Sequence, residues 1–249
     1  MRTSNPTLND NAFRGEMTAF GQQAMTISGT VNKTGILLLL AIATAAWTWR
    51  GFFAAQEAGE PYSMLPALAG VIGGLIFAIA TVIKKNWAPI TAPIYALLEG
   101  LVLGSVSALF ELRYPGLPIQ AVSLTFGVLF VLLLAYRSGL IPVTDKLRIG
   151  IVAATGAIAL FYLVQMFAGF FGFQFTSVNG SGPIGIGFSV VVVIVASLNL
   201  VLDFDFIERG ARAGAPKYME WYGAFGLLVT LIWLYFEILR LLAKLRDRR

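Results

Sequence analysis

The chain has 249 residues, of which 57% are apolar and 12% are charged, and its formal net charge is +5. A soluble domain is roughly half apolar and about a quarter charged, and a soluble protein of this size needs a polar surface that this composition does not provide. The sequence contains no cysteine and no histidine. Disulfides, thiolate metal sites, a serine–histidine triad and histidine–metal cages are therefore excluded. No nucleic-acid-binding motif is visible, and we expect no cofactor.

The apolar residues are grouped into runs long enough to cross a bilayer. A spanning helix needs about 20 apolar residues, because each adds about 1.5 Å and the hydrocarbon is roughly 30 Å thick. The runs are Thr34–Phe53, Met64–Ile83, Trp87–Leu109, Ile119–Tyr136, Gly150–Phe171, Ile184–Leu202 and Trp221–Leu245. We therefore predict an all-α polytopic membrane protein, with a seven-transmembrane-helix bundle at residues 34–245. Residues 1–33 are predicted to form a polar N-terminal tail, with an interfacial helix around Phe13–Met25, and residues 246–249 a basic C-terminal tail.

The positions of lysine and arginine predict the orientation. With the N-terminus in the cytoplasm, the loops at Lys84–Lys85, Arg137–Arg148 and Arg209–Lys217 are cytoplasmic, and the outer loops hold only Arg50 and Arg113. This distribution follows the positive-inside rule. The basic residues after the seventh run then lie outside, against the rule. Either the last run re-enters the membrane, or the first six fix the topology, and we favour seven spans.

Small residues predict close helix crossings. Gly70, Gly73 and Gly74 lie in the second run, and Gly100 and Gly104 in the third. Small residues at this spacing let helix backbones approach closely in lipid. We expect packing inside one bundle in preference to a dimer interface.

Glu99 is the ionisable residue deepest in a predicted span. Ionisable groups at membrane depth are costly and mark functional candidates. Thr91, Tyr95 and Glu99 are spaced by four residues and form one polar stripe on a helix. Two interpretations stay open: a carboxylate that binds a proton or cation in a cavity, or a protonated side chain bonded to a neighbouring helix.

Three acidic residues, Asp203, Asp205 and Glu208, close the sixth run, and Asn199 lies one turn before Asp203. Negative charge at a helix C-terminus is disfavoured by the helix dipole. Nearby cations could neutralise these acids, or one acid could form a latch whose protonation controls the inner mouth of a pore. The cations that follow are Arg209, Arg212 and Lys217.

Glu220 opens the seventh run, and antiparallel packing would place it at a depth similar to that of Asp203. Lys84 and Lys85 end the second run on the same side. These four residues could meet at one mouth, or they could be separate interfacial charges. Glu237 lies about 24 Å into the last helix, where Arg240 is spaced to form a local ion pair with it.

Three short motifs resemble the Bax inhibitor-1 family, the transmembrane BAX inhibitor motif proteins. Leu202-Asp203-x-x-x-Ile207 is similar to the family's Tyr-Asp-x-x-x-Ile ending of the sixth helix. Tyr95-x-x-x-Glu99-Gly100-Leu101-x-Leu103-Gly104 resembles its third helix, and Leu234-Tyr235-x-Glu237-x-x-x-Leu241 its last helix. The order of segments matches across about residues 30–245, and the sequence looks most like the bacterial YccA-like branch, which implies a bacterial plasma (inner) membrane.

The resemblance implies a fold with a central sixth helix and a pH-sensitive calcium or cation leak. In this family an aspartate pair links the sixth and seventh helices and responds to pH. Asp203 matches the first member, where calcium could bind transiently. The local string places Glu237 at the second, although the chain between them is longer than the family's spacing; Glu220 and Asp205 are the other candidate partners.

Two functions compete for this chain. The first is the leak, whose partners are the lipid bilayer and calcium or other cations. The alternative is a non-conducting regulator that binds a membrane protease or another membrane protein, as the resemblance also implies for bacterial relatives. We do not expect the chain to be an enzyme. Hydrolysis of the rhomboid type needs a base that a chain without histidine lacks, and the Gly-x-Gly-Asp signature of intramembrane aspartyl proteases is absent.

Overall fold

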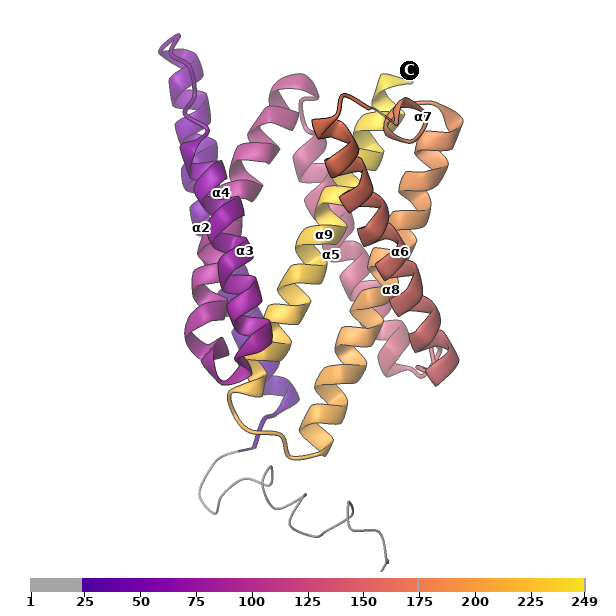
Figure 1. Ribbon diagram of the computed structural model, residues 1–249. Helices are drawn as coiled ribbons and strands as arrows, with labels where there is room; N and C mark the ends of the chain where they lie inside the picture. Colours follow the sequence, from indigo (N-terminus) through magenta and orange to yellow (C-terminus); the bar gives the residue numbers. More distant parts are fainter. Residues whose placement is uncertain (1–23, 174, 249) are drawn as a thin grey trace, which may run out of the picture.

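The computed structural model describes residues 24–173 and 175–248, which form an antiparallel helical bundle (Figure 1). Seven of the helices are long and apolar enough to cross a membrane, which confirms the predicted all-α polytopic fold. The long helices are α2 (Ile27–Glu57), α3 (Leu65–Ile83), α4 (Ala88–Arg113), α5 (Leu117–Arg137), α6 (Asp145–Phe170), α8 (Pro183–Arg212) and α9 (Met219–Asp247). The 3-10 helix η1 (Lys85–Trp87) precedes α4, and the short helix α7 (Thr176–Asn179) precedes α8.

The two ends of the bundle are named here from the chain termini. Helices α2 and α9 begin at the N-terminal end, where α8 also finishes. Helix α9 finishes at the C-terminal end, beside the short helix α7 (Figure 1).

The outer helix boundaries differ from those predicted. Helix α2 begins at Ile27, before the predicted start at Thr34, because Thr26 caps it by accepting a hydrogen bond from the Gly29 amide at 2.9 Å. Helix α9 continues to Asp247, so the predicted basic tail at 246–249 begins inside the helix. The predicted boundaries were drawn from apolar runs, so they leave out the polar turns at the ends of these two helices. The interfacial helix predicted around Phe13–Met25 falls mainly on residues 1–23, outside the described residues.

Helix α9 is the central helix, which corrects the expectation of a central sixth helix. It buries a larger share of its residues than any other span and contacts α2, α4, α5 and α8. Figure 1 shows α9 between the group of α2, α3 and α4 and the group of α5, α6 and α8. Its sequence is apolar on several faces, as a helix surrounded by others requires. Charged side chains on α9 are therefore the ones most enclosed by protein.

Glycines permit the close packing of α4 against its neighbours, as predicted. A Cβ at Gly100 or Gly104 would come within 3.0 Å of the α2 backbone, and one at Gly70 would come within 3.0 Å of the Leu98 carbonyl. Thr44 of α2 donates a hydrogen bond to the Leu97 carbonyl of α4 at 2.8 Å. These small residues therefore serve packing within one bundle.

Candidate functional site

Asp203 lies in the last third of α8, towards the N-terminal end of the bundle, and faces α9. Asp203 Oδ1 would be 3.8 Å from a Cβ at Gly226 of α9. Thr230, one turn further along α9, also lies beside the Asp203 carboxylate. Its Oδ2 is buried and has no hydrogen-bond partner among the described residues. Buried polar atoms are normally bonded. A carboxylate oxygen without a partner, enclosed between two spanning helices, is the strongest candidate for binding a proton or cation.

Asp205 and Glu208 are neutralised by cations. Asp205 Oδ2 lies 3.0 Å from Arg148 Nη2 of α6 and 2.7 Å from Arg209 Nη2. Glu208 Oε1 lies 2.5 Å from Arg212 Nη2, and its other oxygen accepts a hydrogen bond from the Tyr136 hydroxyl. Of the two interpretations of this acidic cluster, neutralisation by cations therefore holds for these two residues. It does not extend to Asp203.

Glu220 is fully buried and joins the beginnings of α2 and α9. Its carboxylate accepts hydrogen bonds from the Thr26 amide at 2.8 Å and the Thr26 hydroxyl at 3.0 Å. Lys33 pairs with Oε2, and Lys217 Nζ lies 2.9 Å from Oε1. A carboxylate is also favoured at the positive end of the α2 dipole. Glu220 therefore caps α2 instead of pairing with Asp203.

Of the two interpretations of Asp203, Glu220, Lys84 and Lys85, the structure contradicts a meeting of all four at one mouth. Lys84 and Lys85 are exposed and lie over aromatic rings, Trp87 at 4.9 Å and Tyr222 at 5.5 Å. In the described part of the chain neither lysine pairs with a carboxylate. The lysines that pair with Glu220 are instead Lys33 of α2 and Lys217, which precedes α9.

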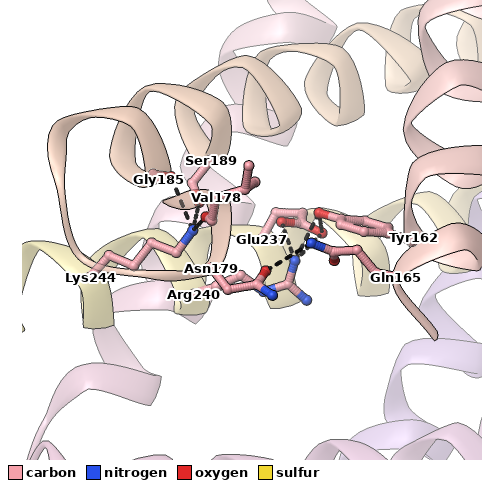
Figure 2. Close-up of polar contacts among 9 residues, drawn as sticks. All are labelled: Tyr162, Gln165, Val178, Asn179, Gly185, Ser189, Glu237, Arg240 and Lys244. Carbon is pink, nitrogen blue, oxygen red and sulfur yellow. Dashed lines mark hydrogen bonds and ion pairs between the residues drawn. The ribbon is translucent and has the colours of Figure 1, made fainter. Parts of the chain in front are cut away.

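Glu237 belongs to a polar cluster towards the C-terminal end of the bundle (Figure 2). It is 2% exposed and accepts a hydrogen bond from the Tyr162 hydroxyl of α6 at 2.9 Å. Arg240 Nη1 lies 3.2 Å from Glu237 and donates to the Tyr162 hydroxyl oxygen at 2.8 Å. The predicted ion pair between Glu237 and Arg240 is confirmed. Sequence reasoning did not find Tyr162, because nothing in α6 marks which face meets α9.

The structure does not bring Asp203 and Glu237 together. Asp203 faces α9 near Thr230, and Glu237 lies seven residues further along that helix, about 10 Å away along its axis. The residues that α9 places opposite Asp203 are uncharged. A two-carboxylate switch between Asp203 and Glu237 is therefore absent from this arrangement.

Lys244 is a buried cation that sequence reasoning did not single out. It is 6% exposed, and its Nζ donates to the Val178 carbonyl at 2.8 Å, the Gly185 carbonyl at 3.0 Å and the Ser189 hydroxyl at 2.9 Å (Figure 2). The sequence did contain a signal for Lys244, because Glu237, Arg240 and Lys244 are spaced by three and four residues and so share one face of the helix.

Glu99 and Asn199 make contacts between helices. Glu99 is half-buried, and a Cβ at Gly74 of α3 would lie 2.9 Å from its Oε1. Asn199 Nδ2 donates to the Thr155 hydroxyl of α6 and to the Val195 carbonyl, both at 2.8 Å. Glu99 therefore faces α3 inside the bundle, and Asn199 bonds α8 to α6.

No resident metal centre is formed by the candidate acids. Among residues 24–173 and 175–248, no three acidic side chains come together as ligands. The acids are instead distributed along the bundle, and most are paired with lysine or arginine. What this arrangement offers is Asp203, whose buried Oδ2 has no hydrogen-bond partner among the described residues and can bind a proton or interact with a passing cation.

The comparisons with known proteins agree with the fold. The sequence model of the family described as "Bax inhibitor 1 like" matches residues 5–247, nearly the whole chain. A search among curated proteins returned no match. Together with the seven apolar helices, the family match establishes a multi-pass membrane protein.

Proposed function

Because the chain belongs to the Bax inhibitor 1 like family, we propose that it is a pH-sensitive leak for calcium or other cations, in which Asp203 is the group that responds to protons. The observation that carries the proposal is the buried Oδ2 of Asp203, which has no partner among the described residues. Family membership and the motif at Asp203 support the same assignment.

The chemistry of Asp203 follows from its surroundings. An ionised carboxylate in a low-dielectric interior is costly unless it is paired and hydrogen-bonded. A proton or a cation at Oδ2 relieves that cost, so the two compete for the same oxygen. Protonation removes the charge that attracts cations, and the pH then controls the leak through the α8–α9 contact.

The other candidate acids have structural roles in this account. Asp205, Glu220 and Glu237 each lie within 3.2 Å of a lysine or arginine nitrogen. Neutralising one of them breaks an ion pair, and Asp205→Asn is expected to change the pH response less than Asp203→Asn. Glu99, which contacts α3, is a second point along the bundle where a proton or cation could bind.

The proposed setting is a bacterial plasma membrane with the N-terminus in the cytoplasm. The distribution of lysine and arginine supports this orientation. It places Asp203 nearer the cytoplasmic surface, about 14 Å from the end of α8 at Arg212. We propose no catalytic reaction; cations are the transported partner.

Calcium flux into proteoliposomes at two pH values tests the proposal. Vesicles that contain the purified chain should take up calcium faster than empty vesicles, and the rate should differ between about pH 6 and about pH 8. Absence of flux at every pH would contradict the leak. It would favour the alternative, a non-conducting regulator that binds a membrane protease or another membrane protein.

A further inference from the structure

A cavity of about 330 Å³ opens at the C-terminal end of the bundle, between the end of α4, the segment around α7 and the end of α9. Its volume falls in the range of small-molecule sites, about 300–1,000 Å³. The wall combines apolar side chains of α4 and α9 with charged and polar groups at the helix ends. This combination suits an amphiphilic ligand. The lining includes Leu109, Phe110, Arg113, Arg240, Lys244 and Asp247.

The charge of the cavity is predominantly positive. Arg113, Arg240 and Lys244 line it, and Asp247 is the acid among the lining residues. Arg240 is also paired through Nη1 with Glu237, which lies outside the lining. Asp247 accepts hydrogen bonds from the Tyr114 hydroxyl and from the Ser181 hydroxyl, the latter at 3.2 Å. The bond to the carboxylate raises the pKa of Tyr114, so this hydroxyl stays protonated.

Lys244 carries a charge that this part of the protein does not neutralise. Its three hydrogen-bond acceptors are two carbonyls and a hydroxyl, all neutral. Among the described residues no carboxylate lies within ion-pairing distance of it. A buried charge without a counter-ion is costly, and an anion in the adjoining cavity would lower that cost.

Arg113 is the cation best placed to meet a ligand. Its side chain is 73% exposed, and its nearest acid, Asp247, is 3.8 Å away. The guanidinium group presents a planar set of donors that matches the oxygens of a phosphate. Because Arg113 ends a membrane-spanning helix, it lies at the level where phospholipid headgroups carry their phosphates.

From this geometry we propose that the cavity binds the phosphate of a phospholipid headgroup, with Arg113 and Arg240 as its ligands and Lys244 as a fixed positive charge behind them. Leu109 and Phe110 contact the apolar part of the lipid next to the glycerol. Asp247 opposes the phosphate and weakens its binding. The proposal does not depend on whether the chain conducts ions.

Native mass spectrometry of the full chain in detergent tests the proposal, with phosphatidylglycerol as the probe and diacylglycerol with the same acyl chains as the phosphate-free comparison. We expect phosphatidylglycerol to bind at least about tenfold more tightly than diacylglycerol, as a charge-assisted contact predicts. Arg113→Gln should weaken phosphatidylglycerol about tenfold, and Asp247→Asn should strengthen it. Because Arg113 is exposed, the variant should keep its fold, which thermal unfolding checks.

Arg50→Gln is the matched control, because Arg50 is an exposed arginine of α2 outside the cavity lining. It should leave phosphatidylglycerol binding unchanged. Displacement of the lipid by millimolar inorganic phosphate would assign the same site to free phosphate, and retention would assign it to the lipid. Equal binding of the two lipids, or equal affinities in Arg113→Gln and Arg50→Gln, would overturn the proposal.

Discussion

The carboxylate of Glu220 lies so close to the Gly29 backbone that a Cβ at position 29 would come within 3.0 Å of its oxygens. Glycine at this position lets the first turn of α2 surround an acid from the start of α9. The same carboxylate pairs with Lys33 and Lys217. The first and last spanning helices are therefore joined at the N-terminal end by one buried ionic cluster.

Gly29→Ala should destabilise the protein, because the added methyl group displaces the Glu220 carboxylate from its lysines. We expect a loss of about 2 kcal/mol or more. Gly35→Ala is the matched control on the same helix, since a Cβ there meets nothing within 4 Å and alanine favours helix by about 0.8 kcal/mol over glycine. Thermal unfolding in detergent measures both. Equal melting temperatures of Gly29→Ala and Gly35→Ala would contradict the close contact between Gly29 and the Glu220 carboxylate.

Glu220→Gln should separate α2 from α9 at their common end. Removing one member of a buried ion pair costs about 3–5 kcal/mol, and here two lysines lose their acid. Exposed Glu60 provides the control, and Glu60→Gln should change the unfolding free energy by no more than about 0.5 kcal/mol. Proteolysis near Thr26 reports the local opening. If both variants resist protease as the native chain does, Glu220 does not hold α2 in place.

Tyr162 and Glu237 should be energetically coupled. The hydroxyl donates to the carboxylate at 2.9 Å, and such bonds between membrane helices contribute about 0.6–2 kcal/mol. A double-mutant cycle with Tyr162→Phe and Glu237→Gln should give a coupling energy of about 1 kcal/mol. Tyr62→Phe, which removes a hydroxyl bonded to Ser105 instead, should be additive with Glu237→Gln. A coupling near zero in the first cycle would contradict the contact.

Gly185 should control how the α7 segment lies on α8. A Cβ there would come within 3.0 Å of the Gly180 and Val178 carbonyls, and the Val178 carbonyl accepts a hydrogen bond from Lys244. Gly185→Ala should therefore accelerate hydrogen exchange around Val178, whereas Gly187→Ala, with nothing within 4 Å, should not. Identical exchange in the two variants would show that the segment is not held through this contact.

The fold was largely predictable from sequence because long apolar runs have one stable structure in lipid, the helix. All of the predicted runs correspond to spanning helices. The ion pair of Glu237 with Arg240 was also predictable, since it depends on spacing within one helix. The ends of α2 and α9 were not, because their polar turns are stabilised by tertiary contacts that hydropathy does not include.

Which side chains of different helices meet could not be predicted from the sequence. Asp203 and Glu220 were expected at similar depth, but depth does not determine the direction in which a side chain points. The orientation of α9 about its own axis points Glu220 towards α2, so that Gly226 and Thr230 face Asp203. Lys244 was missed because it begins the basic C-terminal segment, whose composition is typical of a solvated helix end.

The most direct test of the central claim is the pH profile of calcium flux in Asp203→Asn. Asparagine fixes the neutral state at nearly constant size, so the variant's flux at every pH should match the native protein's flux at the acid end. Asp145→Asn, which alters an exposed acid of α6, should keep the native profile. A native pH profile in Asp203→Asn, with normal amounts of folded protein in the vesicles, would contradict the account.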